Sequence, residues 1–237
     1  MHKVTIPQRI IDRVVKKRGK EHIYEDIDPT KTALIVVDLQ NGFMMEGVAH
    51  SLCKTAVEIV PNVNRIADSL RKTGGLVVWI KNTFTQESLQ SWSVMHSMCN
   101  KDRLAKRIES MTEGSKGHQL WAGLDVQEDD LVIQKTRFSA FIQGSSDLEA
   151  ALKFRGIDTV VITGTVTNTC CESTARDAMM RNFKTIMVSD ANAADSDEEH
   201  NASLIAFYLT FGDLFSTDEL VALLEKNGKS RRAVAAE

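Results

Sequence analysis

From residue 32 onward, short runs of apolar, β-branched residues alternate with stretches whose apolar positions recur at helical spacing. The run Thr32 to Val37 (TALIVV) is typical of a strand buried in a parallel sheet. Apolar residues recur every three or four positions over 57–70, where Pro61 either starts or kinks the predicted helix. Gly74 and Gly75 are expected to end it. The pattern therefore predicts a strand followed by a helix.

The same alternation continues along the rest of the chain. Predicted strands cover residues 32–37, 76–80, 131–133, 159–163 and 185–188, with a short sixth at Leu214 and Phe215. Predicted helices cover residues 57–70, 146–154, 171–181, 200–209 and 217–226. Because such alternation produces parallel sheets covered on both faces, we predict an α/β fold. It has three layers, with a doubly wound, mostly parallel sheet of about six strands and helices on both faces. Residues 84–127 lack a regular pattern and are predicted to form loops and short helices, as a lid or insertion.

Composition narrows the class of protein. The 237 residues are 43% hydrophobic and 26% charged, as in ordinary globular proteins, and a chain of this length buries its core without disulfides or metals. The net charge of −3 argues against a general nucleic-acid binder. No apolar run approaches ~18 residues, which argues against a membrane span. Four cysteines are too few for a disulfide scaffold, so we predict a cytoplasmic protein.

The chain is predicted to contain one main domain, residues 28–226, with an extension at each end. The N-terminal arm, residues 1–27, has seven Lys and Arg against four Asp and Glu. Its apolar residues have helical spacing, so we expect it to pack on the body or on a neighbouring subunit; a nucleic-acid or membrane patch is the alternative. Residues 227–237 are polar and alanine-rich and are predicted to be a mobile tail.

Polar residues directly follow several of the predicted strands. Asp38 follows the first strand, Asn82 the second, Lys135 the third and Asp190 the fifth, while the segment 164–170 follows the fourth. Open α/β sheets bind ligands beyond the carboxyl ends of their strands. An acid, an amine and a thiol are therefore predicted to meet at one edge of the sheet.

Each of these three side chains has a functional and a structural interpretation. Cys170 at a helix start is expected to have a lowered thiol pKa and could act as a nucleophile, although most cysteines are small buried hydrophobes. Asp38 is either a general acid/base or a helix cap. Lys135 is either a cation beside the reacting groups or a solvated charge. Cys171, Cys53 and Cys99 are interpreted as packing or structural residues.

Three ordered motifs resemble those of the isochorismatase-like cysteine hydrolases. Residues 38–43 (DLQNGF) are similar to the D-x-Q-x-x-F opening of that family, and residues 135–141 (KTRFSAF) to its K-x-x-x-S-x-F segment. Residues 164–178 (GTVTNTCCESTARDA) are similar to its G-x-x-T-N-x-C-V-x-x-T-A-R-D-A signature, with Cys171 in place of the usual Val. The resemblance spans about residues 30–225.

The resemblance implies a set of catalytic groups and a reaction. It implies an Asp38–Lys135–Cys170 triad on a Rossmann-like sheet, and a non-proline cis peptide at Thr165–Val166. It also implies an oxyanion hole formed by the Val166 and Cys170 N–H groups. The reaction expected from the family is hydrolysis of a C–N bond through a thioester acyl-enzyme, without a cofactor. True isochorismatases lack the cysteine, so Cys170 indicates amide chemistry.

Substrate-binding residues are predicted around this triad. The segments 79–82, 117–121 and 138–141 look most like the ureidoacrylate branch of the family, and N-carbamoylsarcosine, biuret and nicotinamide amidases are the related alternatives. Asn82 is expected to bind an amide group, and Arg137 to bind a carboxylate or lie at the surface. Three aromatic residues are expected to line an apolar wall or simply pack in the core: Phe84, Trp92 and Phe141.

Metal and partner predictions complete the picture. The nicotinamidases of the family hold a metal through a D-x-H element; this chain has His50, His96 and His118 but no such element there, so we predict no catalytic metal. The expected partners are a small amide or ureido substrate and further copies of the chain, as a dimer or tetramer, with no nucleic acid and no membrane. A non-catalytic α/β binding protein, or a redox protein using Cys170 and Cys171, is the rival hypothesis.

Overall fold

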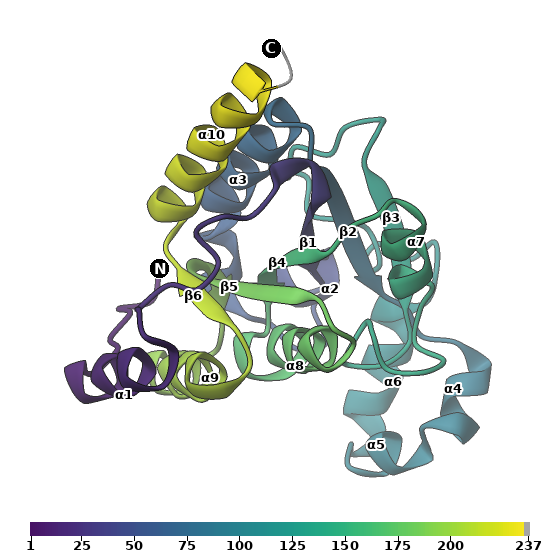
Figure 1. Ribbon diagram of the computed structural model, residues 1–237. Helices are drawn as coiled ribbons and strands as arrows, with labels where there is room; N and C mark the ends of the chain where they lie inside the picture. Colours follow the sequence, from purple (N-terminus) through teal and green to yellow (C-terminus); the bar gives the residue numbers. More distant parts are fainter. Residues whose placement is uncertain (235–237) are drawn as a thin grey trace.

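The computed structural model describes residues 1–234, and six parallel strands form its central sheet (Figure 1). The strands are β1 (Thr32–Val37), β2 (Leu76–Asn82), β3 (Leu131–Lys135), β4 (Thr159–Thr165), β5 (Lys184–Ala193) and β6 (Asp213–Phe215). They are ordered β3-β2-β1-β4-β5-β6, so the chain winds outward from β1 in one direction and from β4 in the other. This order confirms the predicted doubly wound α/β fold, and it creates a switch point between β1 and β4, where such sheets bind ligands.

Ten α-helices connect and cover the described strands. They are α1 (Gln8–Arg18), α2 (Asn41–Met44), α3 (Val60–Lys72), α4 (Gln86–Ser91), α5 (Ser93–Ser97), α6 (Lys101–Met111), α7 (Leu148–Phe154), α8 (Glu172–Met180), α9 (Asp197–Thr210) and α10 (Thr217–Val234). Short 3₁₀ turns cover Pro29–Lys31 and Lys54–Val57, and a π-helical turn covers Thr167–Cys171. No helix in residues 1–234 combines the length and apolar character needed to cross a membrane.

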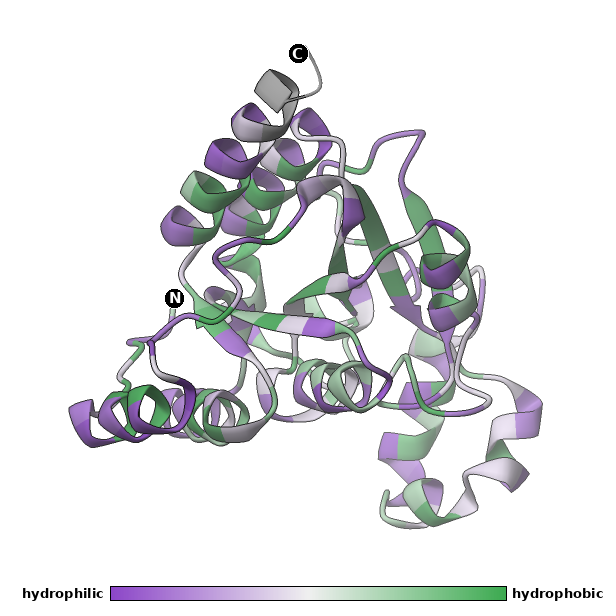
Figure 2. Ribbon diagram, in the orientation of Figure 1, coloured by the Kyte–Doolittle hydropathy of each residue, from purple (hydrophilic) through white to green (hydrophobic). Residues whose placement is uncertain are grey.

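Alternate residues of the central strands face two separate hydrophobic cores. In β1, Leu34 and Val36 pack with α3 and α10, whereas Ala33, Ile35 and Val37 pack with α7, α8, α9 and α1. Figure 1 shows these two helix groups on opposite sides of the sheet, and Figure 2 shows the hydrophobic residues of the strands enclosed between them. Because successive side chains of a strand point to opposite faces, a continuous apolar run such as β1 satisfies both cores.

The strands extend further at their carboxyl ends than their apolar runs predict. β2 and β3 continue to Asn82 and Lys135, which face each other in the ladder. β4 continues to Thr165, which pairs with Ala193 of β5. These polar ends remain in the sheet because the site described below is built on them.

The N-terminal arm packs on the body of its own chain. Ile10 and Val14 of α1 are buried in the core shared with α9. The Arg18 guanidinium donates a hydrogen bond of 2.8 Å to the carbonyl of Gly212 and also contacts the carbonyl of Tyr208. The apolar side of the arm is therefore occupied within the chain, as one of the two predicted arrangements requires.

The final helix continues past the boundary predicted at Lys226, so residues 227–234 of the predicted tail are helical. The Asn227 side chain donates hydrogen bonds of 3.1 and 2.9 Å to the carbonyls of Glu25 and Ile27. Gly228 lies against Thr73 at the end of α3, where a Cβ would come within 2.8 Å of the Thr73 side chain. These contacts carry the helix beyond the last periodic apolar residue. Residues 235–237 of the predicted tail lie outside the described residues.

Candidate active site

A buried ion pair joins the carboxyl ends of two strands. Asp38 directly follows β1 and Lys135 is the last residue of β3. Lys135 Nζ lies 2.8 Å from Asp38 Oδ2, and both side chains are fully buried. Because β2 lies between these strands and strand spacing is ~4.8 Å, the link crosses about 10 Å. A lysine is long enough to bridge it, and its Nζ also donates to the carbonyl of Arg137 at 2.9 Å.

The backbone at Asp38 is shaped to turn this carboxylate into the site. Asp38 has φ of +55°, in the left-handed region that aspartate tolerates better than most residues. Its N–H donates to the carbonyl of Ile80 at 3.1 Å, which fixes the turn against β2. The Gln40 side chain pairs with the backbone of Asn82 through two hydrogen bonds. Gln40 Nε2 donates to the Asn82 carbonyl at 3.2 Å, and Gln40 Oε1 accepts from the Asn82 N–H at 2.8 Å. The ends of β1 and β2 are thereby locked together.

Gly164 lets β4 approach β1 closely just before the third functional side chain. Its φ is +120°, and a Cβ there would lie 2.1 Å from the carbonyl oxygen of Val37. Only glycine combines that conformation with that proximity. The following peptide bond, Thr165–Val166, is cis, as the resemblance implies. The chain then enters the π-helical turn that carries Cys170.

Cys170 completes a cluster with the ion pair. Its side chain is within hydrogen-bond reach of both Asp38 and Lys135. Burial above all, together with the Asp38 carboxylate, raises the pKa of the Cys170 thiol to about 12 against the opposing effect of the Lys135 ammonium, so the lowered pKa expected at a helix start is wrong. Burial lowers the pKa of Lys135, but the negative partners Asp38 and Cys170 outweigh it, and the pKa is raised overall. At neutral pH Cys170 is therefore a thiol, beside the Lys135 ammonium group and its ion-pair partner Asp38.

A cavity of about 320 Å³ opens over this cluster. It is lined by Phe43, His50, Ser51, Asn82, Met95, Met98, Cys99, Arg103, Arg107, Phe138, Val166, Thr169 and Cys170. Its volume suits a small molecule. Cys170 and Val166 lie on the sheet side of this cavity, whereas Met95, Cys99 and Arg107 come from the insertion between β2 and β3. Figure 1 shows that insertion, α4 to α6, projecting from the body beside the sheet.

The isochorismatase domain model matches residues 32–219, which include all six strands and the buried cluster. The chain belongs to the isochorismatase family. It is 32% identical over 176 residues to a probable inactive nicotinamidase of Arabidopsis thaliana, covering 73% of this chain and 86% of that protein.

Solved structures of isochorismatase-family and related hydrolases resemble the chain along most of its length. A cysteine hydrolase from Pseudomonas syringae pv. phaseolicola 1448A superposes with a TM-score of 0.76 at 28% identity, over 85% of this chain and 96% of that one. The N-carbamoylsarcosine amidase of Thermoplasma acidophilum superposes with a TM-score of 0.63 at 26% identity, over 79% of this chain and 97% of that one.

Within this isochorismatase-family site, the structure brings together Asp38, Lys135, Cys170 and Val166, as the sequence predicts. Asn82 also lines the cavity; its side-chain oxygen is buried and has no hydrogen-bond partner among the described residues. An amide oxygen in that state is available to a ligand. Sequence reasoning therefore located the side of the cavity that holds Cys170.

The four other predicted binding residues lie outside the cavity lining. Phe141 packs in the core against Phe183, with ring centroids 5.3 Å apart, and Phe84 packs edge-on to His96. Their strand-end positions do not reveal that the chain turns these rings inward. For Phe84 and Phe141, core packing was the alternative that the sequence left open.

Trp92 and Arg137 form a layer behind the cavity wall. The Trp92 ring packs against Phe138, with centroids 4.8 Å apart, and carries the Arg137 guanidinium 5.2 Å from its centre. Arg137 also donates to the carbonyl of Thr136 and to the side chain of Ser91. These bonds hold Arg137 away from the cavity, and the arginines that line it are Arg103 and Arg107.

Sequence reasoning missed most of the residues opposite Cys170. Phe43 lies inside the D-x-Q-x-x-F motif and Phe138 inside the segment after Lys135, so both were within motifs that the sequence singles out. His50 and Arg107 lie in unpatterned segments and carried no signal. Burial and the nearby Arg107 lower the pKa of His50 to about 3, so the imidazole is neutral at physiological pH.

The histidines of this isochorismatase-family chain are occupied by protein partners. His118 Nε2 lies 2.8 Å from the Thr83 hydroxyl, and His50 Nε2 lies 3.4 Å from Arg107. Burial is also the main cause that lowers the pKa of His118, to about 4. Within the part of the chain that the structure describes, no three His, Cys, Asp or Glu side chains are grouped as a metal site.

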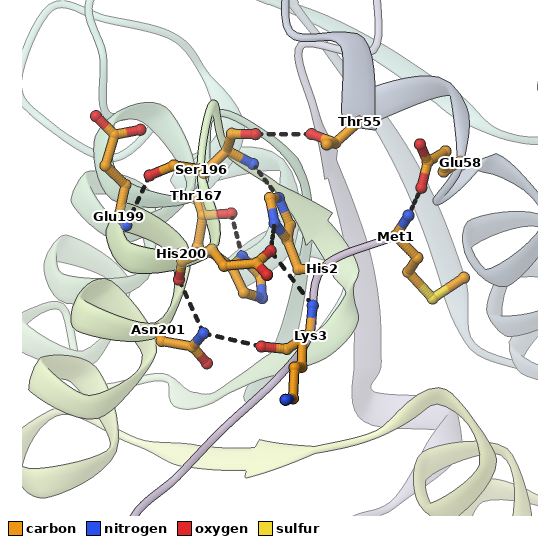
Figure 3. A network of polar contacts seen from close by, with 12 residues as sticks. Met1, His2, Lys3, Thr55, Glu58, Thr167, Ser196, Glu199, His200 and Asn201 are labelled. Atoms are coloured by element: carbon orange, nitrogen blue, oxygen red, sulfur yellow. Dashed lines mark hydrogen bonds and ion pairs between the residues drawn. The ribbon is translucent and has the colours of Figure 1, made fainter.

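The N-terminus lies close to the turn that carries Cys170. The His2 ring stacks on His200 with centroids 4.3 Å apart, donates to Asp197 Oδ1 at 2.7 Å, and accepts from the Ala194 N–H at 2.9 Å (Figure 3). Accepting a backbone N–H through Nε2 makes Nδ1 the protonated nitrogen of His2. The arm is thus fastened to α9 by the His2 ring.

His200 passes this contact on to the turn itself. It accepts through Nδ1 from the Thr167 hydroxyl at 2.9 Å (Figure 3). Through Nε2 it donates to the carbonyl of Ser189, also at 2.9 Å. Burial and the neighbouring His2 lower the pKa of His200 to about 4, so this arrangement holds at neutral pH. Thr167 follows Val166 directly and begins the turn that contains Cys170.

Proposed function

We propose that the chain is a cysteine-dependent amidohydrolase that cleaves a C–N bond of a small amide or ureido compound. The observation that carries this proposal is the buried Asp38–Lys135 ion pair, which holds a base and a cation beside the Cys170 thiol at the cavity. Such a thiol needs a general base, and a carboxylate in hydrogen-bond contact supplies one. A ureidoacrylate-type substrate is favoured, on the sequence resemblance to that branch.

In the first half of the reaction, Asp38 removes the proton from Cys170 as the sulfur attacks the substrate carbonyl. A carbon–sulfur bond forms, and the carbonyl electron pair moves onto oxygen. The Val166 and Cys170 N–H groups receive that oxyanion, and removing one such donor typically lowers the rate ~10²–10³-fold. The positive charge of Lys135 stabilises the negative charge on Asp38 or on the Cys170 sulfur while the proton moves between them.

In the second half, the carbon–nitrogen bond breaks and protonated Asp38 gives its proton to the leaving nitrogen. The acyl group remains on Cys170 as a thioester. Water then loses a proton to Asp38 and attacks the thioester, the carbon–sulfur bond breaks, and the proton returns to sulfur. Every step uses the same three side chains.

The similar proteins support this chemistry at different levels. One solved neighbour is a cysteine hydrolase and another is an N-carbamoylsarcosine amidase, which fits attack by sulfur on a ureido carbon. A relative described as a probable inactive nicotinamidase supports the alternative of a non-catalytic binding protein. The complete cluster of Asp38, Lys135 and Cys170 favours catalysis.

The test measures hydrolysis over ureidoacrylate, N-carbamoyl amino acids, biuret and nicotinamide by release of ammonia. We expect at least one compound to be hydrolysed, and Cys170→Ser to abolish that turnover without loss of folding. Cys99→Ser is the matched control, since Cys99 lines the same cavity without touching the ion pair. Mass spectrometry of quenched reactions should find the acyl group on Cys170. Binding without turnover by the whole panel, or an acyl group on Cys99, would contradict the proposal.

A further inference from the structure

Two arginines make the lining of the cavity cationic. Arg103 and Arg107 lie one turn apart on α6, and both line the cavity. Arg103 is exposed at the rim, whereas Arg107 is partly buried. No Asp or Glu is among the residues that line this cavity in the described chain. His50, the other titratable nitrogen in the lining, is neutral at physiological pH because burial and Arg107 hold its pKa near 3.

Arg107 has no counter-ion of its own within residues 1–234. Its Nη1 lies 3.4 Å from His50 Nε2, and its guanidinium lies 6.0 Å from the centre of the Trp92 ring. Burial lowers the pKa of Arg107, and this is opposed by Cys170 when its sulfur is ionised and by Asp38. Asp38 is already paired with Lys135. A guanidinium stays charged in proteins, and a partly buried charge without a partner is unfavourable.

We propose that Arg107 is a specificity-determining residue that binds a carboxylate of the substrate while the reacting carbonyl lies at Cys170. The planar guanidinium matches a carboxylate in two-point contact, and the Trp92 ring behind it supports that orientation. The preferred substrates are therefore anionic amides or ureido acids small enough for a cavity of about 320 Å³. The inference rests on the proposed function for the position of the carbonyl.

A competing role is that Arg107 acts only by stabilising the Cys170 thiolate. The two roles differ in what they do to charged and neutral ligands. Loss of a carboxylate site weakens reactions of anions alone, whereas loss of thiolate stabilisation slows anionic and neutral reagents equally. Iodoacetate and iodoacetamide form a matched pair for this comparison, because thiolate sulfur displaces iodide from each of them and the two reagents differ by one charge.

The experiment measures alkylation rates of Cys170 and Cys99 by both reagents in the full chain, using peptide mass spectrometry. Both cysteines line the cavity, so Cys99 still reports on the arginine in a Cys170→Ser background. The ratio of the iodoacetate rate to the iodoacetamide rate is the readout. We expect Arg107→Gln to lower this ratio about tenfold or more, since hydrogen bonds to charged groups are worth that much. Arg107→Lys should recover part of it.

Lys106→Gln is the control, because it removes the same charge from the same helix at an exposed position outside the cavity lining. It should change the ratio less than about twofold, since exposed charges are screened. An unchanged ratio in Arg107→Gln, or an equal loss of rate with both reagents, would overturn the carboxylate site. If Cys170 reacts with neither reagent while Cys99 keeps its Arg107-dependent preference, the proposed nucleophile fails and the carboxylate site stands.

Discussion

Replacing Lys135 by methionine tests the ion pair on which the site depends. Methionine keeps much of the length of the side chain and removes its charge. Lys135 Nζ lies 2.8 Å from Asp38 Oδ2 and both side chains are fully buried, so the substitution leaves a carboxylate in the interior without its cation. Removing one partner of a buried pair typically destabilises a protein by ~3–5 kcal/mol. We expect Lys135→Met to lower the free energy of unfolding by about that amount and to abolish hydrolysis.

The double variant Lys135→Met/Asp38→Asn separates the lost pair from the stranded charge. With both charges gone, the interior holds a neutral amide, and we expect about 2 kcal/mol of the lost stability to return. Hydrolysis stays absent, because no base remains for Cys170. Urea unfolding followed by circular dichroism measures all three proteins. A double variant no more stable than Lys135→Met would refute the reasoning, since the isolated Asp38 carboxylate would then not be the source of the destabilisation.

Three further outcomes follow from the same structure. The Cys170 thiol has a pKa of about 12 against an ordinary value of 9.0, so its contribution to stability is complete below pH 9.0 and is lost as pH rises toward 12. Urea unfolding in that interval should therefore show a Cys170→Ala variant losing less stability than wild type, by roughly 1.4 kcal/mol per pH unit. Gly164→Ala places a Cβ 2.1 Å from a β1 carbonyl and should destabilise the chain by ~3 kcal/mol or more in thermal unfolding. His2→Ala should lower the free energy of unfolding by ~1–2 kcal/mol and speed hydrogen exchange at Thr167, whereas exchange confined to α1 would contradict a link to the turn.

The sheet was predictable because each central strand is visible in the sequence as a short apolar run. Runs such as TALIVV satisfy two cores at once, so their apolar character is continuous and their length is that of a strand. Their carboxyl ends were not predictable in the same way. Asn82 and Lys135 are polar residues that remain in the ladder because they serve the site, and polarity alone suggests that a strand has ended.

The buried cluster of Asp38, Lys135 and Cys170 was predictable for a related reason. Topology places strand ends together, so residues following the apolar runs identify Asp38, Lys135 and Cys170 as neighbours before any coordinates exist. Arg107, which also lines the cavity, was not predictable, because it belongs to an insertion without a periodic pattern. The aromatic residue Trp92 shows the other difficulty: whether a ring lines a cavity or supports one that does depends on packing that sequence spacing does not encode.

Because of the insertion α4 to α6, two separate parts of the chain line the cavity. Cys170 and the ion pair lie at the carboxyl ends of the strands, while Met95, Cys99 and Arg107 arrive from a segment that enters and leaves between two strands. Exchange of that segment alone could redirect the protein to another ligand while the buried cluster of Asp38, Lys135 and Cys170 stays intact. Recognition can thus diversify in evolution without rebuilding the strand ends, and an engineer can graft a foreign insertion onto the same scaffold.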